Sequence, residues 1–390
     1  MPARTDGSAK ILNARALNRA TLARQLLLNR NVVTAEKVIE HLVGLQAQVP
    51  SDPYITLWSR IDNFDPQELS ELLLSARAVR CGLMRGTIHL VTARDCVGLR
   101  PLMQPIYDRV YGKGRTMGGK LGDDKEAVTA ACRQLLKERP RTRSEVRTLL
   151  AERWPQHDPE AMSFCLPTLP VVQIPPRGVW GKSGKARWAL VEDWLPDQPA
   201  VAHAIDDVVL RYLGAFGPAT VADVRQWCGL SGLKEVMDRL RPQLVTFRDD
   251  QGRELFDLPE APRPDPETPA PPRFFAEFDN VFLSHADRSR MAPEEFREGM
   301  ASVWLGMQAQ NLPVGFGRPE SMPINWSMFA VDGFLSGTWK LDRRKEAVTL
   351  IVRPMVRLSD DQSAELLEEA RRLLDFLTSG SQIERSVEFL

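Results

Sequence analysis

The spacing of apolar and polar residues predicts three helices and a strand pair in the first third of the chain. Leucine and alanine recur at helical spacing through 12–30, and Thr34 is placed to cap a second helix. Asp65 precedes Pro66 at the start of a third helix, because proline suits the first helical position. Two short strand-like runs around a turn fill 80–91. Three helices and then a strand pair are the order of elements in a winged helix.

The same order recurs in the next stretch of the chain. Helical patterns at 94–110 and 124–138 precede a helix that starts at Thr142. Two strand-like runs then lie within 168–191, separated by a glycine-rich turn, which is typical of a hairpin. The pattern therefore predicts a second winged helix.

A third copy and a proline-rich segment follow. The copy has a helix at 201–213, two helices that Thr220 and Ser231 are placed to cap, and a hairpin at 245–258. Six prolines then occur within 261–272, which predicts a stiff, extended linker rather than a packed element.

Beyond the linker the pattern changes to strands. The strand-like runs lie at 274–284, 326–341, 347–356 and 384–390. Asp332 and Gly333 form a natural hairpin turn, and 360–377 has the pattern of one long helix. This order predicts a small open barrel or sheet with one covering helix.

Together these patterns predict an α+β fold class: tandem winged-helix (helix-turn-helix) units followed by a C-terminal β-barrel-like domain. The predicted boundaries are 1–92 for the first winged helix, 93–196 for the second with its basic hairpin, 197–260 for the third, 261–272 for the linker and 273–390 for the β-barrel-like domain.

Length and composition narrow the class of protein. A chain of 390 residues exceeds what one hydrophobic core usually serves, and 43% hydrophobic with 26% charged residues is ordinary for a globular protein. No run reaches the roughly eighteen apolar residues of a membrane span, and the N-terminus lacks the apolar stretch of a secretory signal. We expect a cytoplasmic protein. The 5 cysteines lack a CxxC pair, the 5 histidines lack metal-ligand spacing, and no GxxxxGK[ST] loop occurs, so we expect no metal and no cofactor.

The formal net charge is zero, but the charges are unevenly distributed. Residues 1–120 hold 17 Lys and Arg against 10 Asp and Glu, a surplus of seven positive charges. Affinity for DNA depends on the local basic patch rather than on the total charge. A double-stranded DNA partner is therefore compatible with this sequence. Since the chain already contains several winged helices, we expect a monomer without an obligate protein partner.

The most informative polar residues are Gln46 and Gln48. Pro50 and Pro53 are expected to stop the preceding helix, which leaves both glutamines in an extended segment. Residues two apart in such a segment point the same way, so both carboxamides would share one surface. Two carboxamides can hold and orient a water molecule, although they are poor general bases. The alternative is that both glutamines simply satisfy the hydrogen bonds of a loop.

Two groups of cations are candidates for phosphate contact. Arg143 and Arg147 lie at a helix entry, where backbone N–H groups also favour anions. Lys182, Lys185 and Arg187 lie at the tip of the second hairpin. The alternative for both groups is a solvated surface, because Lys and Arg are mostly exposed.

A third polar group follows the apolar run at 274–284. It includes Asp287, Arg288 and Arg290, which could line a site for DNA. The alternative is an Asp–Arg pair that locks the C-terminal part to the helical units.

The chain resembles the winged-helix DNA glycosylases of the AlkZ and YcaQ type, in the helix-turn-helix 42 superfamily. The matching segments are GLQAQVPSDPY at 44–54, MRGTIHLVTARD at 84–95, QIPPRGVWGKSG at 173–184, YLGAFGPATVADVRQWCGL at 212–230 and FDNVFLSHADRSR at 278–290. Five motifs in the same order cover most of the chain. Within the second motif, Arg85 and His89 are candidates for DNA contact.

The resemblance implies a fold and an activity. It implies three winged helices and a β-barrel around damaged DNA, and hydrolysis of the N-glycosidic bond of N7-alkylguanine, including bulky adducts and interstrand crosslinks. The Gln-x-Gln motif of AlkZ-like members falls on Gln46 and Gln48, whereas the YcaQ-like branch has an acidic residue at the second position. The DNA-probing hairpin would correspond to Lys182 to Arg187. Since no lysine nucleophile is apparent, we predict a monofunctional enzyme for DNA repair or self-resistance.

Two other classes of protein fit parts of the pattern. A non-catalytic DNA-binding regulator would explain the repeated winged-helix order, and it would prefer one undamaged sequence by several kcal/mol. A protein-interaction scaffold built from winged helices would have no affinity for DNA at low salt.

Overall fold

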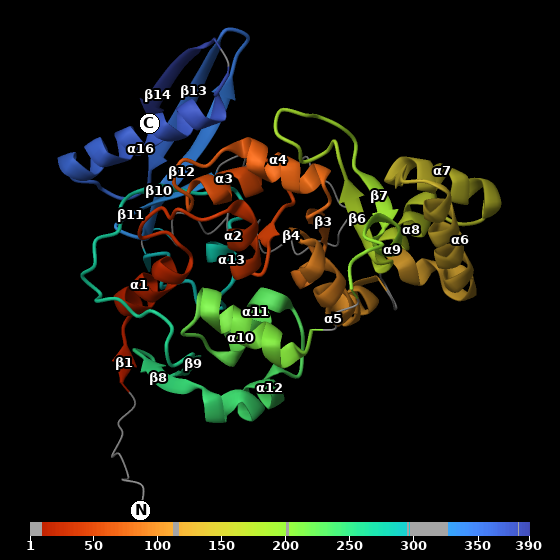
Figure 1. Cartoon of the computed structure of the whole chain (residues 1–390), viewed down its shortest axis with the longest axis horizontal. Coiled ribbons are helices and arrows are strands. Elements are labelled where there is room, and N and C mark those ends of the chain that lie inside the picture. Colours follow the sequence, from red (N-terminus) through yellow and green to blue (C-terminus); the bar gives the residue numbers. More distant parts are fainter. Residues whose placement is uncertain (1–9, 112–116, 200–202, 295, 297–326, 381) are drawn as a thin grey trace, which may run out of the picture.

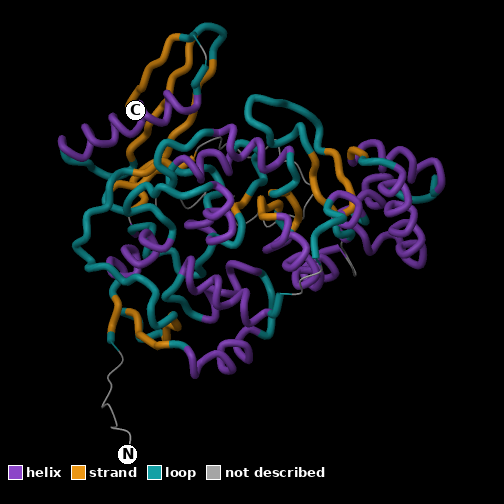
Figure 2. Tube along the Cα trace, in the orientation of Figure 1, coloured by secondary structure: helices purple, strands orange, loops and turns teal. Residues whose placement is uncertain are grey.

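A six-stranded antiparallel sheet joins the first two predicted units. The computed structural model describes residues 10–111, 117–199, 203–294, 296, 327–380 and 382–390. In spatial order the strands are β2 (Leu45–Gln46), β4 (Ile88–Thr92), β3 (Ala78–Gly82), β6 (Val171–Ile174), β7 (Arg187–Leu190) and β5 (Arg141–Thr142). β3 pairs with β6, so the two predicted strand pairs form one sheet (Figures 1 and 2). The sheet therefore runs across the predicted boundary at residue 92.

Helices surround this sheet, and side-chain caps define where several of them begin. Their bounds are α2 (Ala35–His41), α3 (Asp52–Trp58), α4 (Pro66–Leu74), α5 (Ala93–Tyr111), α6 (Lys125–Glu138), α7 (Arg143–Arg153), α8 (Pro159–Ser163) and α9 (Val191–Trp194). Thr34 and Asp65 cap α2 and α4, and Thr142 forms a capping box with Glu145 at the start of α7. The three predicted helix starts are thereby confirmed.

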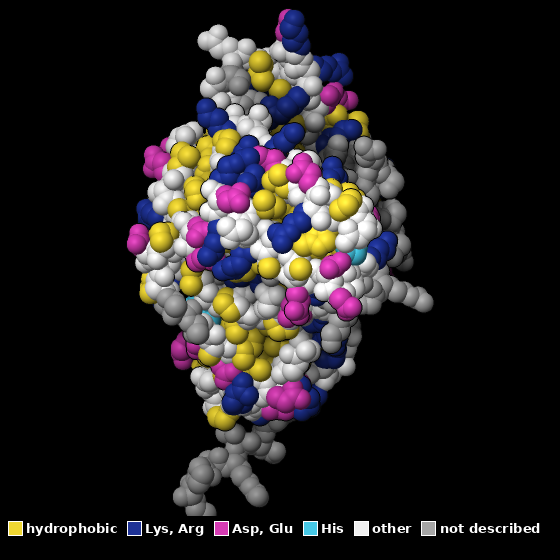
Figure 3. Space-filling view, turned by 90° about the vertical axis from the view of Figure 1, so that its right-hand side faces the viewer, with side chains coloured by type: hydrophobic (Ala, Val, Ile, Leu, Met, Phe, Trp, Pro, Cys, Tyr) yellow, Lys and Arg dark blue, Asp and Glu magenta, His cyan; other side chains and the backbone are white. Residues whose placement is uncertain are grey.

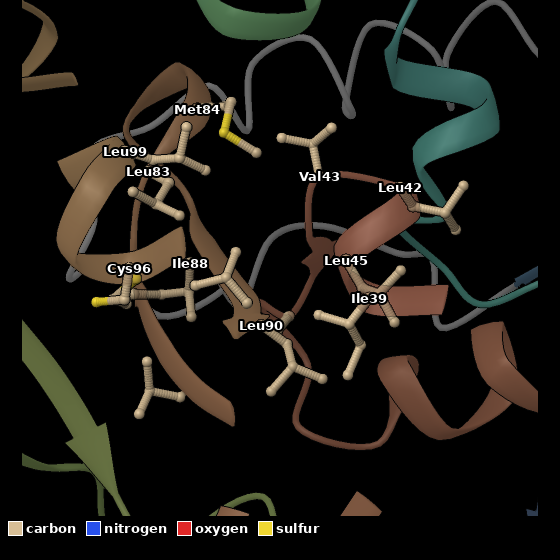
Figure 4. Close-up of a cluster of buried hydrophobic side chains, with 14 of the residues drawn as sticks. Ile39, Leu42, Val43, Leu45, Leu83, Met84, Ile88, Leu90, Cys96 and Leu99 are labelled. Carbon is tan, nitrogen blue, oxygen red and sulfur yellow. The ribbon is translucent and has the colours of Figure 1, made fainter. Parts of the chain in front are cut away.

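Buried apolar side chains hold the short strand β2 in place. In Figure 4 the labelled side chains gather between α2, β2, β4 and α5: Ile39, Leu42, Val43, Leu45, Leu83, Met84, Ile88, Leu90, Cys96 and Leu99. Burying a large aliphatic side chain stabilises a fold by about 1.5–3 kcal/mol. The residues that follow Leu45 therefore leave a well-anchored strand.

The third predicted unit also has three helices followed by a hairpin. Its elements are α10 (Ile205–Phe216), α11 (Val221–Cys228), α12 (Leu233–Leu240), β8 (Val245–Asp249) and β9 (Glu254–Asp257), and β1 (Ile11–Leu12) pairs in parallel with β8. Thr220 caps α11, as predicted. The predicted cap at Ser231 was wrong, because the residue before α12 is Gly232, in a left-handed conformation with φ +75°. Residues 201 and 202 of the predicted first helix lie outside the described residues.

The C-terminal part is an open sheet covered by one helix. Its strands are β10 (Arg273–Phe274), β11 (Ser327–Val331), β12 (Phe334–Arg343), β13 (Ala347–Pro354) and β14 (Glu384–Phe389), hydrogen-bonded in that order. α16 (Asp360–Leu377) packs on this sheet (Figure 1). Asp332 and Gly333 form the predicted hairpin turn with φ of +49° and +78°. The mixed α+β class and this sheet are as predicted, and the winged-helix character of the preceding units stays a prediction.

The prediction of one strand over 274–284 was wrong. Only its first residue belongs to β10, and α13 (Asn280–Leu283) follows. The Asp279 side chain accepts the Val281 N–H and so caps this short helix. Helical turning brings Phe282 against Phe275, with ring centroids 5.0 Å apart.

Helix α1 (Ala14–Arg24) connects distant parts of the chain through buried arginines. The helix is shorter than the predicted range 12–30. Arg19 Nε donates to the Thr268 carbonyl at 2.7 Å, and Arg24 Nε donates to the Pro262 carbonyl at 3.2 Å. The segment 261–272 has no helix or strand, as predicted, but these bonds hold it along α1 rather than leaving it as a free spacer.

Within the described ranges, no helix has both the length and the apolar character needed to cross a membrane. Nor do three or more His, Cys, Asp or Glu side chains come together in those ranges as ligands for a metal ion.

Candidate functional site

The segment that carries Gln46 and Gln48 is not helical, but only its first part is extended: Gln46 ends strand β2, and the chain bends at Gln48. Gln46 is the last residue of β2 and pairs with His89 across the sheet. The Ala47 N–H still donates to the Ile88 carbonyl at 2.8 Å. Since the segment is not helical, the two glutamines do not diverge around a helix axis.

A glycine, rather than the following prolines, leads the chain from α2 into β2. Gly44 has φ +97°, and a side chain there would lie 2.5 Å from Val91 Cγ1. α2 has already ended at His41, and Pro53 lies in the first turn of α3. The prediction that Pro50 and Pro53 stop the helix was therefore wrong.

Gln46 is held on two sides by residues distant in the sequence. Its Oε1 accepts a hydrogen bond from Arg85 Nη2 at 2.6 Å. Its backbone N–H donates to Asn280 Oδ1 at 3.1 Å, and Asn280 Nδ2 donates to the Gly44 carbonyl at 2.7 Å. Because guanidinium nitrogens only donate, the oxygen of the Gln46 carboxamide must face Arg85.

Gln48 is oriented by the sheet itself. Its Oε1 accepts the Ile88 backbone N–H at 3.1 Å. This donor fixes the orientation of the carboxamide in the same way as Arg85 fixes that of Gln46. Among the described residues, none accepts a hydrogen bond from the Nε2 of either glutamine. Within the described part of the chain, both NH2 groups therefore keep their donors unused, on a buried Gln46 and a half-buried Gln48.

Arg85 connects the predicted third unit to the Gln46 side chain. It lies in a 3-10 turn (Met84–Gly86) with φ +56°, and its Nη1 donates to the Trp227 carbonyl of α11. The pKa of Arg85 is lowered to about 10, mainly by burial and to a smaller degree by the charge of Arg288. The guanidinium is still charged at neutral pH. The predicted DNA-contact residue Arg85 therefore binds Gln46 and has Arg288 as a charged neighbour.

His89 lies beneath the site as a neutral, buried imidazole. Its Nδ1 donates to the Thr87 carbonyl at 3.1 Å, and its Nε2 has no partner among the described residues. Burial lowers the pKa of His89 to about 3, and the charge of Arg85 acts in the same direction. A fully buried neutral ring offers no positive charge to a phosphate, so its burial argues against the predicted DNA contact.

His285 has the same character, and it makes the stability of the fold depend on pH. Its Nε2 donates to the Phe216 carbonyl at 2.9 Å, and burial lowers its pKa to about 3, helped by the charge of Arg290.

We expect the free energy of unfolding to fall as the pH drops below about 6.5, the pKa of an unperturbed histidine. The unfolded chain then binds protons on its histidines. The folded chain does not, because the pKa values of His89 and His285 are about 3 there. Each imidazole contributes a loss of up to about 1.4 kcal/mol per pH unit. Urea titrations at pH 7.5, 6.5 and 5.5 should show a smaller loss for His285→Gln than for the unchanged chain, and equal losses would contradict the assignment.

The basic hairpin has an exposed tip on a fixed base. The connection 175–186 between β6 and β7 arches beside α4 in Figure 1. At its base Tyr54 Oη donates to the Gly178 carbonyl at 2.8 Å. At its tip Lys182 and Lys185 are exposed. Arg187 instead lies in β7 and donates to the Pro140 carbonyl at 3.3 Å.

Arg143 and Arg147 lie on α7. Both form ion pairs with Glu160 of α8, with nitrogen–oxygen distances of 2.6 and 3.1 Å. Arg143 also lies over the Phe164 ring, 4.8 Å from its centroid. Figure 3 shows basic and acidic side chains interspersed over the face of the molecule that it draws. Neither arginine contacts the glutamine pair, and their role in DNA contact stays a prediction.

The segment 284–290 packs against the predicted third unit. Asp287 forms an ion pair with Arg253 between β8 and β9, which agrees with the alternative that such a pair locks the two parts together. Arg290 is buried and donates to the Pro218 carbonyl at 2.9 Å. Its burial argues against DNA contact. Arg288 is largely buried, and this burial lowers its pKa.

Sequence reasoning missed three polar residues around the glutamine segment. Asn280 binds both ends of β2, and Arg80 Nη2 donates to the Ala47 carbonyl at 2.7 Å. Asp52 is buried, and burial raises the pKa of its carboxyl well above the usual range, with Glu277 adding to the effect. Only Asn280 had a local signal, because Asp and Asn are depleted in strands and favoured at helix starts.

Comparisons with known proteins assign the chain to a family of DNA glycosylases, a class of hydrolases that act on N-glycosyl bonds. A family model described as "DNA glycosylase AlkZ-like" matches residues 39–376, and the chain belongs to the AlkZ-like DNA glycosylase family.

A curated relative and a solved structure, both from Streptomyces sahachiroi, are similar to the chain. The first, an "interstrand DNA cross-link repair glycosylase", is 25% identical over 61% of this chain and 64% of its own length. The chain thus matches somewhat less than two thirds of that relative. The second is the solved structure of "DNA glycosylase AlkZ", with TM-score 0.70 and 20% identity, covering 97% of this chain and 100% of that chain. This likeness shows a shared fold.

Proposed function

We propose that the chain is a monofunctional DNA glycosylase that hydrolyses the N-glycosidic bond of N7-alkylguanine, including bulky adducts and interstrand crosslinks. One observation carries the proposal: the carboxamide oxygens of Gln46 and Gln48 are both held by N–H donors, at 2.6 and 3.1 Å. Two NH2 groups, two residues apart in the chain, have no acceptor among the described residues and can bind the substrate. The physiological role we propose is DNA repair or self-resistance to an alkylating compound.

The chemistry of the substrate explains why carboxamides suffice. An N7-alkylguanine carries a positive charge, so it leaves as a neutral base without prior protonation. The sugar then becomes positively charged at C1′, and the protein needs to place a water molecule there. The Nε2 groups of Gln46 and Gln48 can hold the oxygen of this water, and the second lone pair of either Oε1 can accept one of its protons.

The surroundings of the pair are consistent with simple hydrolysis. Among the described residues, no lysine contacts Gln46, Gln48 or Arg85, and we propose a reaction without a Schiff base to the sugar. Arg85 is charged and donates to Gln46. Its charge polarises the Gln46 carboxamide, and a guanidinium does not act as a nucleophile. The expected product is an intact strand with an abasic site.

The lesion class is supported by the resemblance in sequence and by one relative. The relative's printed name describes repair of interstrand crosslinks. We propose the same class of substrate for this chain. The exposed Lys182 and Lys185, on the fixed hairpin, are our candidates for contact with the DNA backbone, since compact ammonium groups suit phosphates.

The test is excision from a duplex that carries one N7-alkylguanine. Purified protein is incubated with the duplex, and a denaturing gel is run with and without alkaline treatment. We expect a strand break only after alkali, because base release leaves an alkali-labile abasic site. An intact strand with both an N7-methyl and a bulky lesion would contradict the proposal. Preferential binding to one undamaged sequence would then indicate a regulator.

A further inference from the structure

Strand β2 leaves the six-stranded sheet at Ala47 in an unusual way. In an antiparallel ladder, every second pair of opposite residues exchanges two backbone hydrogen bonds, and Ala47 and Ile88 lie opposite each other at such a position. The Ala47 N–H donates to the Ile88 carbonyl at 2.8 Å, but the Ile88 N–H does not return to Ala47. It donates instead to Gln48 Oε1 at 3.1 Å. The side chain of Gln48 thus takes the place of a backbone carbonyl in the sheet.

Arg80 is the reason that the Ala47 carbonyl is absent from this position. Arg80 lies on β3, on the other side of β4 from β2, and is buried. Its Nη2 donates to the Ala47 carbonyl at 2.7 Å. Its direct neighbour across the strands is Gln173, whose Oε1 has no partner among the described residues. The guanidinium therefore binds the backbone of the glutamine segment rather than the side chain of Gln173.

We propose that Arg80 is the positioning residue of Gln48: by holding the Ala47 carbonyl, it leaves the Ile88 N–H to the Gln48 carboxamide and so fixes the direction of the Gln48 NH2 group. This inference rests on the proposed excision activity. Arg80 itself acts only through Ala47 and Gln48. Burial lowers the pKa of Arg80 to about 9, so it is protonated and able to donate at neutral pH.

The same guanidinium lies against the base of the basic hairpin. A side chain at Gly178 would place its Cβ 3.0 Å from Arg80 Cδ and 3.6 Å from Nε and Nη1. Gly178 has φ +92°, and its carbonyl accepts the Tyr54 hydroxyl. Arg80 thus lies between Ala47 and Gly178. A shift of the backbone at either residue would therefore move Arg80 and change the position of the Gln48 carboxamide.

The first test compares two replacements of the arginine. We expect Arg80→Met to slow single-turnover excision by about 100-fold, the effect of misplacing a reacting group by about 1 Å. DNA affinity should stay within about twofold, because the buried guanidinium makes no phosphate contact. Arg80→Lys keeps a donor and should recover part of the rate. Arg100→Met is the matched control, since Arg100 is also buried but binds carbonyls at 167–169.

The second test uses a pair of glycines in the same loop. Gly178→Ala and Gly181→Ala impose the same kind of backbone strain, with φ of +92° and +67°. A Cβ at Gly181 meets nothing within 4 Å, whereas one at Gly178 meets Arg80. We expect only Gly178→Ala to slow excision at an unchanged DNA affinity.

The outcomes separate this inference from the proposed function. Unchanged excision by Arg80→Met, or equal losses for Arg80→Met and Arg100→Met, would overturn the positioning role while leaving the activity intact. If the unchanged protein excises no base, the proposed glycosylase function is wrong. A crystal structure of Arg80→Met then decides the inference alone: the Gln48 carboxamide should leave the Ile88 N–H, and its retention would overturn the role.

Discussion

Gln46→Ala and Gln48→Ala are expected to excise N7-alkylguanine about 100- to 1,000-fold more slowly than the unchanged protein, the usual cost of removing a preorganised donor from a catalytic site. DNA affinity should be largely kept, because neither carboxamide contributes charge. The measurement is single-turnover excision on a duplex with one lesion, with affinity measured separately on the same duplex.

Two further variants show which part of the carboxamide acts. Gln48→Glu keeps an oxygen for the Ile88 N–H but replaces the NH2 group by a second, negatively charged oxygen, so an unchanged rate would contradict a role for Nε2. Gln251→Ala replaces an exposed glutamine in the turn between β8 and β9 and should not change the rate. If both Gln46→Ala and Gln48→Ala excise at the unchanged rate, the assignment of the motif is wrong.

Arg60→Met is expected to lower the free energy of unfolding by about 3–5 kcal/mol, because it leaves a buried carboxylate without its partner. Arg60 Nη1 and Nη2 each lie 2.8 Å from a carboxylate oxygen of Asp279, and both side chains are fully buried. Asp279 precedes Asn280, which binds Gln46, so this ion pair also supports the site. Urea titration at neutral pH measures the change.

The matched control is an exposed ion pair of the same kind. Arg239 and Asp206 lie 2.5 Å apart with side chains 54% and 28% exposed. Arg239→Met should cost much less stability than Arg60→Met, because water screens the exposed pair. Adding Asp279→Asn to Arg60→Met should restore part of the lost stability, since it removes the unpaired charge and keeps a helix cap. Similar losses for Arg60→Met and Arg239→Met would contradict the buried-pair interpretation.

The predictions from sequence succeeded where a short-range signal was present. Thr34, Asp65 and Thr220 begin helices because a side-chain oxygen reaches an N–H two or three residues away. The turn at Asp332 and Gly333 needs two left-handed residues, which these residue types tolerate. At 274–284 the apolar residues alone did not distinguish a strand from a short helix, and Asp279 decided it.

The candidate site also combines features that the sequence predicted with contacts that it did not predict. The pair of glutamines was evident from the sequence, and so was the extended conformation at Gln46, whereas the bend at Gln48 was not. Arg85 was proposed for DNA contact, yet it binds Gln46, and His89 is buried beneath the site. The sequence contains no signal for these contacts, because their partners lie tens of residues apart and meet only when β2, β3 and β4 pair.

By itself the sequence determined the family, the mixed α+β class, many helix starts and the identity of the two glutamines, because local caps, periodicity and short motifs are encoded within a few residues. Only the tertiary structure decided which way the carboxamides face. Arg85, Ile88 and Asn280 reach the glutamine segment from elsewhere in the chain, and Arg80 removes the Ala47 carbonyl from the sheet. Hydrogen bonds of this kind depend on strand order and register, which no local pattern specifies.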